Sequence, residues 1–180
     1  ASARSLDGGD MLLDLYDAQN NPIAYSDDFS DIHPYLLTRL PEDGAYSLVV
    51  NWSDWGTFLE SGAAIATLFG PFRLTAAVME APPPPLGDDV LTGTPEQRLW
   101  RFAGRAGDVV TLSAESTSGS EDRNLWLRLL DTGLAPIAFS DNAVGLNPSL
   151  TAELPADGEY IIEVGWFGDE GGYRLNTSVE

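Results

Sequence analysis

The sequence predicts an all-β protein built from two tandem β-sandwich domains of the jelly-roll or Greek-key kind. Gly and Pro are frequent, with 18 and 12 residues, and they interrupt short apolar runs, which is typical of strands joined by turns. Outside residues 58–69, no long stretch combines a helical apolar stripe with capping residues. The chain also resembles itself at an offset of 114 residues.

The internal repeat covers residues 13–52 and 127–166, which align without a gap. In this window 17 of 40 positions are identical. The shared skeleton reads L-x-L-x-D, then P-I-A-[YF]-S-D, then L-P-x-D-G-x-Y-x-x-x-V-x-W. A match of this density predicts a duplicated module.

Each repeated segment has the alternation of a half-buried strand. Residues 13–16 and 160–164 place apolar side chains at every second position. Residues 17–22 and the Asp43-Gly44 pair predict turns. A Tyr two residues after such an Asp-Gly pair, as at Tyr46, predicts the tyrosine corner of Greek-key sandwiches.

Four consecutive Pro residues mark the boundary between the copies. Residues 82–85 favour an extended polyproline II conformation, which acts as a semi-rigid spacer. We therefore expect a first sandwich over 1–80, a Pro-rich linker over 81–90 and a second sandwich over 91–180.

The second copy carries the residues of a family resemblance. It contains Trp100-Arg101-Phe102-Ala103-Gly104-Arg105-Ala106-Gly107-Asp108-Val109-Val110-Thr111-Leu112 and, later, Leu154-Pro155-Ala156-Asp157-Gly158-Glu159-Tyr160. These segments resemble the bacterial pre-peptidase C-terminal domain, over all of 91–180 and part of 1–80. The resemblance implies a jelly-roll-like sandwich on secreted or surface proteins, and it carries no catalytic residue over to this chain.

The first copy differs from the second at its beginning. Ala1-Ser2-Ala3-Arg4 aligns with Leu112-Ser113-Ala114-Glu115, so the first copy has no equivalent of the strand-like run 98–103. A sandwich that lacks a strand exposes unpaired backbone groups. We expect the edge to be completed by an upstream segment, by a strand donated from a neighbouring chain, or by a permuted pairing within this chain.

The first copy also holds an apolar insertion at about 55–70, with 13 more residues than the second copy has there and a single charge. Apolar residues left in water favour aggregation, so the insertion either folds onto its own module or forms a docking surface. The candidate interaction residues are Trp55, Phe58, Leu59, Ile65, Leu68 and Phe69.

The charge balance limits the classes of partner. The formal net charge is −19, and all nine basic residues are Arg. Nucleic acids and anionic membranes are poor partners for such a chain, because both require clustered cations. No apolar run approaches the roughly 20 residues that cross a bilayer, so direct membrane insertion is not expected. We expect other protein subunits or domains as partners.

Residues for catalysis are scarce. His33 is the sole His and Cys is absent, so neither a two-His zinc site nor a thiolate site can be built. We assign no catalytic residue and no organic cofactor. His33 aligns with Asn147 before a Pro, which indicates a loop residue and not the His of a Ser-His-Asp triad.

Calcium is the one cofactor that the pattern suggests. Asp27, Asp28 and Asp31 lie in one loop, and Asp17 lies in the preceding turn. Closely spaced carboxylates supply the oxygen ligands that calcium requires. The alternative is a solvated acidic turn, because the second copy keeps only Asp141 and Asn142 in this loop.

Trp52 and Trp166 occupy equivalent positions at the ends of equivalent strands. Such residues either stack on a sugar or pack in the core or at its rim, and their repetition in both copies favours packing.

These observations predict a non-catalytic extracellular or cell-surface module of a bacterial protein, which assembles with other subunits or domains. The alternative is an accessory domain that holds a secreted peptidase or other hydrolase on its protein or polysaccharide substrate.

The calcium hypothesis predicts a specific rise in thermal stability. A ligand that binds only the folded state adds about 2.7 kcal/mol at 100 times its dissociation constant. Millimolar calcium should therefore raise the melting temperature more than sodium at equal ionic strength. Equal shifts with both salts would mean that the loop is only screened charge.

Overall fold

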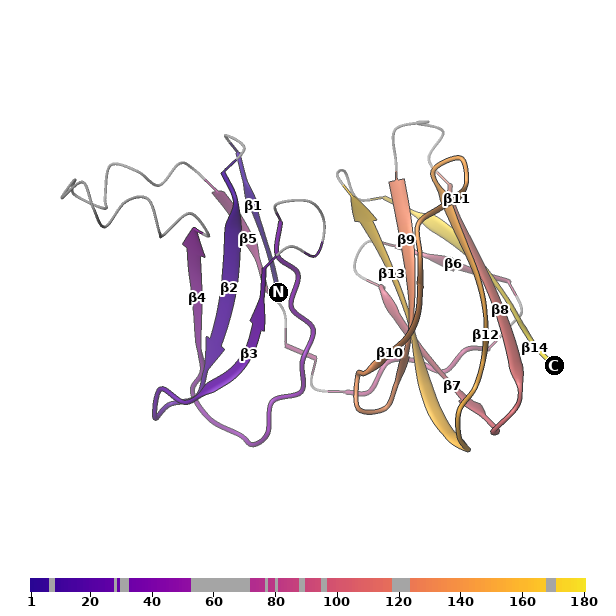
Figure 1. The fold of residues 1–180 in the computed structure, drawn as a ribbon, viewed down its shortest axis with the longest axis horizontal. Helices are drawn as coiled ribbons and strands as arrows, with labels where there is room; N and C mark the ends of the chain where they lie inside the picture. Colours follow the sequence, from indigo (N-terminus) through magenta and orange to yellow (C-terminus); the bar gives the residue numbers. More distant parts are fainter. Residues whose placement is uncertain are drawn as a thin grey trace. The chain divides into compact units, whose positions relative to one another are not determined.

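The computed structural model describes residues 1–6, 9–27, 29, 33–52, 72–76, 78–79, 81–87, 90–94, 97–117, 124–167 and 171–180. The chain divides into two compact units, Ala1–Met79 and Glu80–Glu180 (Figure 1). Every regular element of the described residues is a strand, and the strands form antiparallel sheets. The prediction of an all-β sandwich architecture is confirmed. Within the described residues, no helix is long and apolar enough to span a bilayer.

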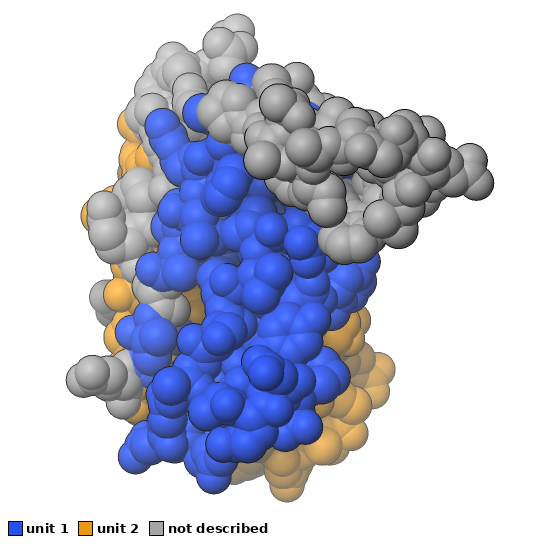
Figure 2. All heavy atoms as spheres, turned by 90° about the vertical axis from the view of Figure 1, so that its left-hand side faces the viewer, with its two compact units in different colours: residues 1–79 blue, residues 80–180 orange. Residues whose placement is uncertain are grey.

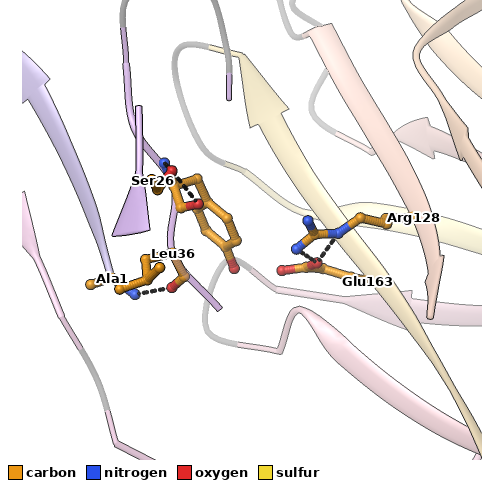
Figure 3. Close-up of polar contacts among 6 residues, drawn as sticks. Ala1, Ser26, Leu36, Arg128 and Glu163 are labelled. Carbon is orange, nitrogen blue, oxygen red and sulfur yellow. Dashed lines mark hydrogen bonds and ion pairs between the residues drawn. The ribbon is translucent and has the colours of Figure 1, made fainter. Parts of the chain in front are cut away.

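The first unit contains two sheets that face each other across one apolar core. Its strands are β1 (Ser2–Ser5), β2 (Met11–Tyr16), β3 (Pro22–Ser26), β4 (Ser47–Trp52) and β5 (Phe72–Thr75). One sheet has the order β3-β2-β4, and the other pairs β1 with β5. A bridge between Ser2 and Tyr35 extends the second sheet beyond β1. Beside it, the N-terminal amino group of Ala1 donates a hydrogen bond of 2.7 Å to the carbonyl of Leu36 (Figure 3).

The second unit has more strands in each sheet. They are β6 (Val90–Gly93), β7 (Leu99–Gly104), β8 (Val109–Ser116), β9 (Asn124–Asp131), β10 (Pro136–Ser140), β11 (Asn142–Val144), β12 (Asn147–Glu153), β13 (Gly158–Phe167) and β14 (Tyr173–Val179). One sheet has the order β10-β9-β13-β7, and the other has the order β11-β12-β8-β14-β6.

The pairing registers of the two units coincide. The β2–β4 ladder places Leu13 opposite Val50, and the β9–β13 ladder places Leu127 opposite Val164, 114 residues later on both strands. The β2–β3 and β9–β10 ladders also correspond, including an irregularity near the end of each. Strands with the same apolar alternation thus adopt the same register, as expected where one face is buried.

The second sheet of each unit shows a similar correspondence. The β1–β5 ladder places Ala3 opposite Leu74, and the β8–β14 ladder places Ala114 opposite Leu175. The alignment of residues 1–4 with 112–115 is therefore the alignment that the sheets use. β1 corresponds to β8, and β5 corresponds to β14.

Alternate residues of the strands fill each core. In the second unit, both sheets contribute fully buried side chains, among them Val110, Leu112, Leu127, Leu129, Ile162, Val164 and Leu175. Among the described residues of the first unit, the buried core members are fewer: Ala3, Met11, Leu13, Leu15 and Leu36. Each fully buried Leu or Val contributes about 1.5–3 kcal/mol, so the described residues provide more hydrophobic stabilisation in the second unit than in the first.

The tyrosine corner is present in both units, as predicted. The hydroxyl of Tyr46 donates a 2.5 Å hydrogen bond to the carbonyl of Glu42, and the hydroxyl of Tyr160 donates one of the same length to the carbonyl of Ala156. Each bond ties the loop before β4 or β13 to the beginning of that strand.

A second feature that the units share is the turn after β2 and after β9. In both turns one residue has a positive φ, which is 63° at Asn20 and 65° at Leu134. In this left-handed conformation the Cβ of any side chain lies close to a carbonyl oxygen. Asn offsets the cost by local hydrogen bonding of its short polar side chain, which Leu cannot do. The second unit therefore holds a strained residue where the first unit holds a compatible one.

This contrast predicts opposite effects of exchanging the two residues. Leu134→Asn should raise the free energy of unfolding of the second unit by about 0.5–1 kcal/mol, because the left-handed conformation then costs less. Asn20→Leu should lower that of the first unit by a similar amount. Urea unfolding of both variants measures the two changes, and equal signs would contradict the assignment to backbone strain.

Candidate interaction site

In the first unit, β4 is the last strand of its sheet. It pairs with β2 on one side, and no other strand within the described ranges pairs with its outer side. In the second unit, the corresponding strand β13 pairs with β9 on one side and with β7 on the other. Figure 2 shows the first unit in blue from the side on which β4 lies in Figure 1. The outer side of β4 thus presents its backbone N–H and C=O groups without a described partner strand.

The other sheet of the first unit ends in the same way at β5. β5 pairs with β1 alone among the strands described, whereas β14 pairs with both β8 and β6. Phe72 and Leu74 on β5 are 44% and 42% exposed, whereas their counterparts Tyr173 and Leu175 are both 0% exposed. We call the outer sides of β4 and β5 the open edges.

A third residue differs in exposure from its counterpart in the same way. Leu40 is 38% exposed, whereas its counterpart Leu154 is 1% exposed. In the second unit, the turn after β7 covers this position: the N–H of Gly107 donates to the carbonyl of Leu154 at 2.9 Å, and the N–H of Leu154 donates to the carbonyl of Asp108 at 2.8 Å. The counterparts of all three exposed residues are therefore covered, in the second unit, by β6, β7 or the turn after β7.

Residues on β6 and β7, and just before β7, surround the side chain of Tyr173 in the core of the second unit. The indole N–H of Trp100 donates a 2.8 Å hydrogen bond to the hydroxyl of Tyr173, which donates to the carbonyl of Gln97. Burial raises the pKa of the Tyr173 phenol, and the bond from Trp100 and the charge of Arg98 act in the opposite direction. Gly93 on β6 leaves room for the ring, because a Cβ there would lie 2.0 Å from a ring carbon. The Phe at position 72 lacks the hydroxyl that this arrangement uses.

The outer side of β7 is covered by the Pro-rich segment. The N–H of Arg101 donates to the carbonyl of Pro84 at 3.0 Å, the N–H of Leu86 donates to the carbonyl of Arg101 at 2.7 Å, and Nε of Arg101 donates to the carbonyl of Pro83 at 2.9 Å. The segment expected to be a spacer is thus, at Pro83–Leu86, an edge cover of the second unit. Because Pro offers no N–H, such a cover ends the sheet.

Asp17, the first candidate metal ligand, is engaged by its own turn. One carboxylate oxygen accepts hydrogen bonds from the N–H groups of Gln19 and Asn21 at 2.9 and 2.8 Å, and the other accepts from the Asn21 side chain at 2.8 Å. These bonds, that of the Asn21 side chain above all, lower the pKa of Asp17. The side chain has an evident structural role in the turn.

The remaining metal candidates are only partly described. The carboxylate of Asp27 accepts a 2.7 Å hydrogen bond from the hydroxyl of Tyr25, and its other oxygen is buried with no partner in the described region. Asp28 and Asp31 lie outside the described residues. No cluster of three or more His, Asp or Glu side chains occurs in the part of the chain that the structure describes. Calcium binding stays a prediction.

The predicted interaction residues of the insertion, Trp55, Phe58, Leu59, Ile65, Leu68 and Phe69, all lie outside the described residues. Of the two equivalent Trp residues, Trp166 is buried and packs edge-on against Tyr173, with ring centroids 5.7 Å apart. Packing is therefore the role of Trp166, whereas the side chain of Trp52 is not described.

His33 shows no catalytic arrangement in the region described. Its Nδ1 atom is buried without a hydrogen-bond partner there. In a Ser-His-Asp triad this nitrogen is held by a carboxylate.

Sequence reasoning did not identify the exposed residues Leu40, Phe72 and Leu74. The signal was available, because each aligns with a residue of the second unit that is buried. Comparing the expected burial of aligned positions in the two segments would have identified these residues.

No family model matches the chain, and no curated protein matches its sequence. Among solved structures, PliG of Aeromonas hydrophila, a periplasmic inhibitor of g-type lysozyme, is 21% identical with a TM-score of 0.43, over 53% of this chain and 94% of its own. The pre-peptidase C-terminal domain of a Bacillus anthracis collagenase is 15% identical with a TM-score of 0.45, over 58% of this chain and 100% of its own. Similarity at this level assigns no function to the chain.

The turn of Asp17 generates a titration prediction. Its carboxyl should titrate below the ordinary range of Asp, and Asn21→Ala should return the pKa toward the ordinary value, because the largest stabilising hydrogen bond is lost. A lowered folded-state pKa means that the stabilisation is present above the unfolded-state pKa and is lost as the pH falls through the folded-state pKa. Carboxyl chemical shifts followed by NMR measure both values, and an unshifted Asp17 would contradict the described turn.

Proposed function

We propose that the chain is a non-catalytic structural and interaction module of a secreted or cell-surface bacterial protein. In this proposal, its units are two copies of one sandwich related to the pre-peptidase C-terminal domain. The first unit has no strand at the positions of β6 and β7 within its described residues, and it uses its open edges to assemble with other subunits or domains.

The observation that carries the proposal is the difference in burial between equivalent positions. Phe72 and Leu74 are 44% and 42% exposed, and their counterparts in the second unit are 0% exposed. Apolar side chains and unpaired strand edges that lie together mark surfaces for association, because water satisfies neither as well as a partner protein does. A strand edge also offers main-chain hydrogen bonds, which join chains without requiring a particular sequence.

The charge of the chain supports the same class of partner. A formal net charge of −19 keeps most of the surface solvated and repels nucleic acids and anionic lipids. Apolar contacts at the open edges operate despite this repulsion when salt screens it, since the Debye length is about 8 Å at physiological ionic strength. This property suits a protein that acts outside the cell.

The proposal predicts weak self-association that increases with ionic strength. Screening reduces the repulsion between acidic chains while the apolar contacts persist. Sedimentation velocity of the purified chain at low and at near-molar sodium chloride should show a concentration-dependent rise in mean mass at high salt. The double variant Phe72→Asn and Leu74→Asn should remain monomeric under the same conditions.

The matched control is Val144→Asn in the second unit. Val144 is 72% exposed, so its replacement removes more exposed apolar surface per residue without touching the open edges. It should associate like the unmodified chain. A chain that stays monomeric at every salt concentration, or a control that abolishes association equally, would count against assembly through the open edges.

A further inference from the structure

The pairing of β7 with β13 in the second unit indicates which kind of strand would pair with the open edge of β4. β7 pairs antiparallel with β13, placing Phe102 opposite Tyr160 and Trp100 opposite Ile162. Beyond the end of β7, the N–H of Val164 donates to the carbonyl of Arg98 at 2.9 Å. The outward-facing donors of β13 therefore come from its even-numbered residues. The same reasoning assigns the outward donors to Leu48 and Val50 on β4 and to Tyr46 just before it.

The burial of the side chains in and just before β4 also indicates room for such a strand. Tyr160, Ile162 and Val164 are buried, whereas the corresponding Tyr46, Leu48 and Val50 are only partly buried although they pack against the first core. In the second unit, the ring of Phe102 stacks on Tyr160 with centroids 5.6 Å apart. The ring of Tyr46 has no such partner ring within the described residues. An aromatic or aliphatic side chain at the matching position would complete the core.

The net charge of the first unit indicates the charge of the strand that would pair with β4. Residues 97–107, which contain β7, carry three Arg and no acidic residue. The first unit, residues 1–79, carries eleven acidic residues against three Arg, a formal net charge of −8. A basic strand is therefore attracted to the first unit by long-range electrostatics as well as by edge pairing.

We propose that β4 of the first unit is an acceptor for an extended basic strand of the β7 type, in which apolar or aromatic residues alternate with polar ones. The strand adds antiparallel to β4 in the register of β7 on β13, with its aromatic residues opposite Tyr46 and Leu48. This proposal rests on the proposed function and names the chemistry of the partner.

Phe72 broadens the range of strands that fit. In the second unit, Trp100 donates its indole N–H to the hydroxyl of Tyr173. Phe72 offers no acceptor there, so the residue opposite Leu48 needs no donor. Any large apolar side chain satisfies that position, whereas Trp is required for the hydrogen bond in the second unit.

The test uses the full chain and a fluorescein-labelled synthetic peptide with the sequence of residues 97–107. Fluorescence anisotropy should show saturable binding that weakens as salt increases. A peptide carrying Trp100→Pro lacks the N–H that faces β4, and its affinity should fall about tenfold or more, which corresponds to about 1.4 kcal/mol. Equal affinities of the two peptides would overturn strand addition.

Amide hydrogen exchange by NMR locates the bound peptide. Peptide binding should slow the exchange of the Leu48 and Val50 amides at least tenfold and leave the β13 amides unchanged. Slow exchange of Leu48 and Val50 in the free chain would show that the edge is already occupied, and protection confined to β13 would show strand replacement in the second unit. Either result overturns the proposal.

A chain variant provides an independent check. Val50→Pro removes an outward-facing donor and should abolish peptide binding, with the exchange rates of the β2 amides reporting whether the first unit remains folded. If the variant unfolds, the comparison of the two peptides decides. If the chain self-associates but does not bind the peptide, the proposed function is supported and the role of β4 as an acceptor is rejected. If the chain binds the peptide but does not self-associate, β4 is supported as an acceptor and assembly through self-association is rejected.

Discussion

The central antiparallel ladder of each unit, β2 with β4 and β9 with β13, is the constraint on which the other elements depend. Alternate apolar residues, such as Leu13 opposite Val50, fix the register because a shift by one residue would turn the buried set toward solvent. The tyrosine corner then fixes where the second strand begins, and the Asx-type turn fixes where the first strand ends. The ladder then has two outer edges: β3 or β10 pairs with the edge of β2 or β9, and the edge of β4 or β13 remains.

That remaining edge is treated differently in the two units. In the second unit it carries β7, and the outer side of β7 is covered in turn by Pro83–Leu86. Pro cannot extend a ladder, so the sheet ends there, which is a common protection of natural sheet edges. In the first unit, β4 carries neither device among the described residues. The two units thus differ at this edge: that of the second unit is closed against further pairing, and that of the first has no partner strand among the described residues.

The sequence was sufficient to predict the elements that rest on local periodicity and turn chemistry. The strands around Leu13 and Tyr160 and the corners at Tyr46 and Tyr160 follow from alternation and from the Asp-Gly pairs. The edge role of Pro83–Leu86 was not predicted, because composition alone favours an extended spacer and does not reveal which strand lies beside it. The strained φ of Leu134 was likewise hidden, since Leu gives no sign of a left-handed conformation.

The candidate site illustrates a more general limit of local reasoning. Carboxylate clusters and isolated aromatics draw attention because their chemistry is distinctive, yet Asp17 serves its own turn and Trp166 packs in the core. The exposed residues Leu40, Phe72 and Leu74 have no distinctive chemistry and become informative only through their buried counterparts. Because the two units share their pairing registers, the second unit can serve as a reference for the first. Leu40, Phe72 and Leu74 are exposed, whereas their buried counterparts in the second unit lie beside β6, β7 or the turn after β7. Their agreement is the reason to seek the partner of this chain among β-strands.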